Sequence, residues 1–197
     1  MPNKLYLECY SGISGDMTVA ALLDLGADQQ VLMEGLESLN LPGYQLKIGR
    51  VKKNGIDACD FDVILDEPEH DHEHHHDHEH EHPHDHEHEH HHHHDHVHRN
   101  IGDIFAIIDQ SKISDRAKQT AKDIFRIIAA AESKAHGIAE DQVHFHEVGA
   151  VDSIVDIVSA AICLDNLDIT EAVVSDLYEG CGYVHCQHGL MPVPVPA

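Results

Sequence analysis

A histidine-rich tract interrupts the chain near its middle and constrains how the rest can fold. Residues 70–98 carry 18 of the 23 histidines, mixed with Asp and Glu. Because the tract has almost no apolar side chains, it has little to bury that would offset the conformational entropy lost on ordering. The sequence therefore predicts a disordered insert over 68–98, placed between the two halves of one folded domain, 1–67 and 99–197.

The composition of the tract indicates metal binding. Neutral imidazole binds zinc, copper, iron and nickel, and neighbouring carboxylates offset the charge of the cation. A flexible tract cannot hold an open coordination position in fixed geometry, so we expect it to collect metal and not to catalyse. The densest candidate ligands are His74, His75, His76, His90, His91, His92, His93 and His94.

The charge of the chain excludes several classes of partner. The net charge is −24, and the twelve acids of 66–98 leave −12 for the remainder. A chain without a basic face is a poor ligand for nucleic acid and for anionic membranes. The N-terminus has no apolar secretory segment and no apolar run is long enough to span a bilayer, so we expect a cytoplasmic protein. The five cysteines are expected to be free thiols or ligands.

The hydrophobic pattern predicts an α/β (or α+β) domain with small sheets and helices in layers. A short apolar strand, a glycine-containing turn and a helix open the chain, which is typical of an α/β layer. The dipeptide Asn54-Gly55 predicts a tight hairpin, and Gly137 is expected to end a long helix. Strands are expected over 5–9, 44–53, 58–65, 143–148 and 172–177, and helices over 17–25, 29–39, 100–110, 114–136 and 153–167.

A first candidate site is the turn that follows the first predicted strand. Its members are Ser11, Gly12, Ser14, Gly15 and Asp16. Small residues let a ligand approach the backbone, and the free N–H groups at the start of the next helix attract phosphate. Asp16 can instead hold a cation. The structural alternative is that Ser14 or Asp16 only caps the helix.

A second candidate site is a histidine pair followed by acids. In a strand, His144 and His146 project to one face, and Glu147 lies beside the strand's end. Asp152 and Asp156 are four residues apart, on one face of the next helix. Imidazoles and carboxylates that converge there suit a divalent first-row metal or a metal-bound phosphate. The alternative is an exposed strand and solvated helix acids.

A third candidate site lies near the end of the chain. Thiols and imidazoles alternate there over a few residues, which suits a soft or borderline metal. The spacing is not that of a zinc finger, and the alternative is that the cysteines are small buried residues. The candidate ligands are His185, Cys186 and His188.

Three longer motifs stand out along the chain: LYLECYSGISGDM over 5–17, HFHEVGAVDSIVD over 144–156 and HGLMPVPVPA over 188–197. Together they resemble the LarC family of nickel-insertion proteins. The histidine-rich insert between them is also similar to that of the family. The motifs occur in family order and cover nearly the whole chain.

The resemblance implies insertion of Ni(II) into pyridinium-3,5-bisthiocarboxylic acid mononucleotide, which gives the nickel-pincer cofactor of lactate racemase. It implies an enzyme of the lyase class that uses CTP with Mg(II) or Mn(II). It also implies a further C-terminal domain or a companion chain that carries CTP binding, and lactate racemase apoprotein as a partner. Formation of the nickel–carbon bond requires a base for the ring proton, and the candidates are Asp16, His144 and His146.

Two alternatives remain open from the sequence. One is a nickel storage or delivery protein without chemistry of its own. The other is a nucleotide-binding regulatory domain in which the histidine-rich insert is incidental.

Overall fold

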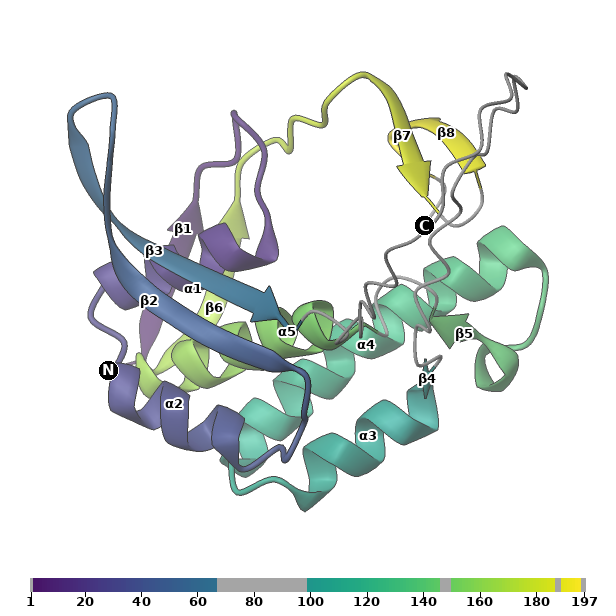
Figure 1. Cartoon of the computed structure of the whole chain (residues 1–197), viewed down its shortest axis with the longest axis horizontal. Helices are drawn as coiled ribbons and strands as arrows, with labels where there is room; N and C mark the ends of the chain where they lie inside the picture. The colour runs from purple at the N-terminus through teal and green to yellow at the C-terminus, as the bar shows by residue number, and fades with distance from the viewer. Residues whose placement is uncertain (1, 67–98, 146–149, 187–188, 196–197) are drawn as a thin grey trace, which may run out of the picture.

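The structure is a computed structural model that describes residues 2–66, 99–145, 150–186 and 189–195 (Figure 1). The predicted insert and its candidate ligands lie outside these residues, as do His146, Glu147 and His188. The elements are β1 (Asn3–Leu7), α1 (Gly15–Asp24), α2 (Gln29–Glu37), β2 (Tyr44–Lys53), β3 (Ile56–Leu65), β4 (Arg99–Asn100), α3 (Ile101–Gln110), α4 (Asp115–His136), the 3-10 helix η1 (Glu140–Gln142), β5 (His144–Phe145), α5 (Val151–Asn166), β6 (Ile169–Val174), β7 (Gly182–Cys186) and β8 (Gly189–Val193).

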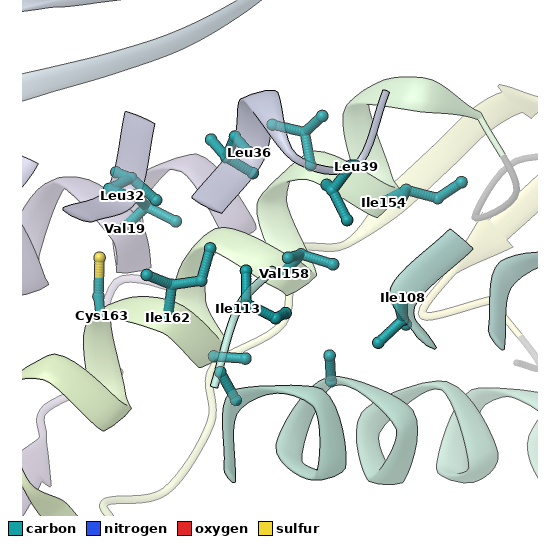
Figure 2. Close-up of a cluster of buried hydrophobic side chains, with 14 of the residues drawn as sticks. Val19, Leu32, Leu36, Leu39, Ile108, Ile113, Ile154, Val158, Ile162 and Cys163 are labelled. Atoms are coloured by element: carbon teal, nitrogen blue, oxygen red, sulfur yellow. The ribbon is translucent and has the colours of Figure 1, made fainter. Parts of the chain in front are cut away.

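The fold is a mixed α/β domain, as predicted, and α5 is its central helix. Ile154, Val155 and Val158 on this helix are fully buried. Figure 2 shows Ile162 and Cys163 beside Val19 of α1, within the cluster of buried side chains. Each buried branched side chain contributes about 1.5–3 kcal/mol to folding, so α5 holds α1 and α4 in place around it.

Small side chains let α4 pack closely on α5. The buried residues of α4 are Ala117, Ala121, Phe125 and Ala129, at the helical spacing of four. The helix ends at Gly137, which has a φ of 67°, as the sequence predicts.

The described strands form pairs, not one large sheet. β1 and β6 are parallel, with Tyr6 opposite Val173, and they come from the two halves of the chain. β2 and β3 form an antiparallel hairpin whose turn residues Asn54 and Gly55 have φ of 52° and 84°. Positive φ at both positions is the geometry that the Asn-Gly dipeptide favours, so the predicted hairpin is confirmed.

Some predicted boundaries are wrong. β6 begins at Ile169 and ends at Val174, because its position is set by parallel pairing with β1 and not by its own apolar pattern. Of the strand expected over 143–148, the structure describes only β5, which pairs with β4. The β7–β8 hairpin was not expected at all, since Gly and Pro are poor strand formers. No helix in the described part of the chain is long and apolar enough to cross a membrane.

Candidate functional site

The segments that follow β1 and β6 are hydrogen-bonded to one another at the same end of the sheet. The Cys9 carbonyl accepts hydrogen bonds from the N–H groups of Gly12, at 3.2 Å, and Tyr178, at 3.3 Å. The Cys9 N–H donates to Ser175 Oγ at 2.8 Å. Figure 1 shows both segments leaving the sheet side by side. In open α/β folds, ligands bind outside the carboxyl ends of parallel strands, so this end is the candidate site.

The predicted turn forms the entry to α1. Gly12 has a φ of 84°, and a Cβ there would lie 3.6 Å from the Tyr178 carbonyl oxygen, so the two segments approach closely. Ser14 occupies the N-cap position, but its side chain makes no capping bond to the backbone. Its hydroxyl donates to the Asp16 carboxylate instead. Ser14 is therefore at the N-cap position, as the structural alternative expects, but it does not cap the helix through its side chain. Ser11 is exposed at the start of the turn.

The Asp156 carboxylate lies against the first turn of α1. The Asp16 N–H donates to it, and a Cβ added at Gly15 would lie 2.7 Å from the Asp156 Cβ. Gly15 is therefore required by this contact between α1 and α5. An N–H group at the positive end of α1 is already paired with a carboxylate, which leaves less capacity for a free phosphate than the turn alone predicts.

The Asp156 carboxylate lies within reach of the charges of two others, Asp16 and Asp152. Burial, and then the negative charges of Asp16 and Asp152, raise the pKa of Asp156 to about 6. The Oδ1 atoms of Asp152 and Asp156 are buried and accept no hydrogen bond, and the same holds for the Ser159 hydroxyl. Buried oxygens without a partner are costly, and carboxylate oxygens are the ligands that hard divalent cations prefer. These carboxylates have the chemistry that attracts such a cation, but among the described residues they do not form a complete metal-binding group.

His144 is exposed on β5, and its neighbour Phe145 anchors that strand. Phe145 is buried against Phe125, with 6.3 Å between the ring centroids. Among the residues that the structure describes, no group of three or more His, Cys, Asp or Glu side chains is arranged to hold a metal ion. The structure therefore brings Asp16, Asp152 and Asp156 near one another but does not join them to His144.

The third predicted site is described only in part. His185 is exposed on β7, and the backbone of Cys186 pairs with that of Gly189 on β8. Cys181, just before β7, is an exposed free thiol.

Sequence reasoning missed an aromatic pair at the same strand ends. The rings of Tyr10 and Tyr178 meet edge to face, with 6.0 Å between centroids. A hydrogen bond with Tyr10 is the main cause of a raised pKa for Tyr6. Nothing in the spacing links Tyr10 to Tyr178, because only the pairing of β1 with β6 brings them together.

The fold and the site define an α/β domain with paired carboxylates at the ends of parallel strands, interrupted by a histidine-rich segment. The family described as "Nickel insertion protein" matches residues 5–197. The chain belongs to this family, and the resemblance seen in the sequence is confirmed.

The curated relatives are longer than this chain. A "Pyridinium-3,5-bisthiocarboxylic acid mononucleotide nickel insertion protein" of Alkaliphilus metalliredigens is 65% identical over 100% of the chain and 45% of the relative. A protein of the same name from Geobacillus kaustophilus is 46% identical over 98% of the chain and 43% of the relative. A "Putative nickel insertion protein" of Geotalea uraniireducens is 44% identical, with the same coverage. The chain thus spans less than half of each. No solved structure matches it significantly.

Proposed function

We propose that this chain takes part in inserting Ni(II) into pyridinium-3,5-bisthiocarboxylic acid mononucleotide. The observation that carries the proposal is the family match over residues 5–197, together with the names of relatives that match the whole chain. Nickel is a substrate in this reaction and ends in the product. The rival function, storage or delivery without chemistry, shares the metal-binding step but forms no new product.

Nickel is collected on the histidines of 70–98 and passed to an ordered site. We assign His144, His146 and Glu147 to that site, with Asp152 and Asp156 as ligands or hydrogen-bonding neighbours of ligands. His185, Cys186 and His188 then receive nickel, because thiolate matches the sulfur-rich acceptor. Support for an accessible ligand comes from the exposed position of His144. The two α5 carboxylates have unpaired oxygens, but the described residues do not join them to His144. Asp16, His144 and His146 are the candidates for the base that removes the ring proton.

The carboxylates of Asp16, Asp152 and Asp156 favour a phosphate that arrives with a divalent cation. A bare phosphate would meet three negative charges beside α1, whereas Mg(II) or Mn(II) would be attracted by the same oxygens. Phosphate oxygens and water would complete the coordination, since the described residues alone do not form a metal-binding group. The cation would neutralise the charge between phosphate and carboxylates. Ser11, Gly12, Ser14 and Gly15 would line the approach of the phosphate.

We further propose that the reaction uses CTP with Mg(II) or Mn(II), as a lyase-class cyclometallation, in the cytoplasm. CTP binding is assigned to the C-terminal part of the longer relatives, or to a companion chain that supplies it. Lactate racemase apoprotein is the proposed recipient of the finished cofactor. Each assignment extends the family resemblance and awaits its own assay.

The proposed function is tested by product mass. The chain is incubated with Ni(II) and the bisthiocarboxylic acid mononucleotide, with and without CTP and Mg(II). Each mixture is tested alone and with the C-terminal part of a longer relative. A nickel-bearing mononucleotide is the expected product, and His144→Ala should lower its yield. If no combination forms this product, the chain is not an insertase component.

A deletion of 70–98 separates the insertase from the storage protein. The insertase should keep its activity at high nickel concentration, because the histidines of this tract only raise the local supply. A storage protein should lose nearly all bound nickel and all measurable function. Binding of CTP to the chain without nickel, measured by calorimetry, would instead favour the regulatory domain.

A further inference from the structure

Two exposed tyrosine rings stand at the carboxyl end of the β1–β6 pair. Tyr10 and Tyr178 are 56% and 59% exposed, and their ring planes meet at 66°. We propose that this pair binds the cationic pyridinium ring of the mononucleotide, an inference that rests on the proposed function for the identity of the substrate. The pair would be a specificity-determining element beside the turn that leads into α1, where the Tyr178 carbonyl oxygen approaches Gly12.

The backbone beneath the two rings is held firmly. Ser175 N–H donates to the Leu7 carbonyl at 2.9 Å, and Ser175 Oγ accepts from the Cys9 N–H. The Cys9 carbonyl then binds the N–H of Tyr178 itself. Two segments far apart in sequence thus carry the two rings on one hydrogen-bonded stretch of backbone. Because this backbone is already ordered, ligand binding there costs less side-chain and loop entropy.

The face of an aromatic ring attracts a cation, and the charged residues that flank these two tyrosines in the chain are acidic. A cation within about 6 Å of a tyrosine ring gains attraction from the ring quadrupole. The segments 5–46 and 170–197 contain no Lys or Arg. Glu8, Asp176 and Glu179 are exposed beside the two tyrosines in sequence. A positively charged ring is therefore favoured over a neutral ring of the same shape.

The same charges oppose the anionic groups of the substrate. Its two thiocarboxylic acids and its phosphate carry negative charge, so only the ring itself gains from the acidic surroundings. We therefore expect binding to strengthen when a divalent cation neutralises the phosphate.

The test compares two ligands that differ in ring charge. Nicotinamide mononucleotide carries a pyridinium ring, and its reduced dihydro form has the same substituents on an uncharged ring. Binding of each to the 197-residue chain is measured by calorimetry with Mg(II) and without nickel. The unsubstituted chain should bind the charged form more tightly. Replacement of either tyrosine by Leu should weaken binding of the charged form by about twofold to thirtyfold. The affinity for the reduced form should stay nearly unchanged.

Control variants separate recognition of the pyridinium ring from a purely structural role of the two tyrosines. Tyr10→Phe and Tyr178→Phe keep the rings and should keep the preference. Tyr183 on β7 is 74% exposed, and its replacement by Leu should change the affinity for neither the charged nor the reduced form. If the pair only fastens the two segments, the Leu variants lose thermal stability but keep the preference for the charged ring, which overturns the inference. Equal binding of both forms by the unsubstituted chain, or binding of neither, also overturns it.

Failure of this inference and failure of the proposed function give different results. If the chain prefers the charged ring but no nickel-bearing product forms, the proposed insertion fails and the pyridinium site stands. If product forms and Tyr10→Leu and Tyr178→Leu leave the KM for the mononucleotide unchanged, insertion stands and the tyrosine site is refuted.

Discussion

Replacement of Asp156 by Asn should stabilise the protein at neutral pH and lose this effect in acid. The pKa of Asp156 is raised from 3.8 to about 6 by burial and by the nearby carboxylates. A shift of this size corresponds to about 3 kcal/mol at full strength. Since the carboxyl is only partly buried, solvent screening reduces the expected effect to about 1–2 kcal/mol. The Asn side chain keeps an oxygen to accept the Asp16 N–H.

The raised pKa of Asp156 makes the folded protein less stable as the pH rises. Below pH 3.8 the carboxyl is protonated in both states, so it does not affect the free energy of unfolding. As the pH rises from 3.8 to about 6, the unfolded chain loses its proton first, and the folded protein becomes less stable. Above pH 6 the full cost is present. The Asn variant lacks this decline, so its advantage over the unsubstituted chain should appear between pH 4 and pH 6.

The assay is urea unfolding followed by circular dichroism at pH 4 and pH 7.5, with a chelator present. Asp141→Asn, at an exposed position of η1, is the matched control for the change of charge. If Asp156→Asn is no more stable than the unsubstituted chain at pH 7.5, or gains equally at both pH values, the account of this carboxylate is refuted.

Two further substitutions test the packing around the site. Gly15→Ala should lower the free energy of unfolding by about 1–3 kcal/mol, because the new Cβ would meet Asp156. In the control Gly49→Ala, the added Cβ meets nothing within 4 Å, so no such clash is expected. Thermal melts compare the two variants. Phe145→Ala should lower it by about 3–5 kcal/mol through loss of the contact with Phe125, and urea unfolding measures this. A loss below 1 kcal/mol would mean that β5, and His144 with it, is not anchored by this contact.

Local chemistry was enough to predict several elements. Asn54-Gly55 forms its turn because both residues accept positive φ, and Gly137 ends α4 for the same reason. The helices follow the spacing of their apolar residues, as α4 shows with Ala117 and Ala121. These features depend on residues within a few positions of one another.

The remaining features depend on contacts between distant segments. The start of β6 is set by pairing with β1, so the polar Thr170 and Glu171 belong to a strand despite their low hydrophobicity. The first turn of α1 suggested a phosphate site, but α5 places Asp156 there and changes its electrostatics. The contact between Tyr10 and Tyr178 likewise requires the folded arrangement.

The most direct measurement is a single transfer of nickel from the loaded chain to the acceptor. The chain is saturated with Ni(II), free metal is removed, and pyridinium-3,5-bisthiocarboxylic acid mononucleotide is added with CTP, Mg(II) and the C-terminal part of a longer relative. Nickel should leave the protein and appear in the mononucleotide, as seen by mass measurement. If nickel stays on the chain while the acceptor remains unchanged, nickel insertion by this protein is contradicted.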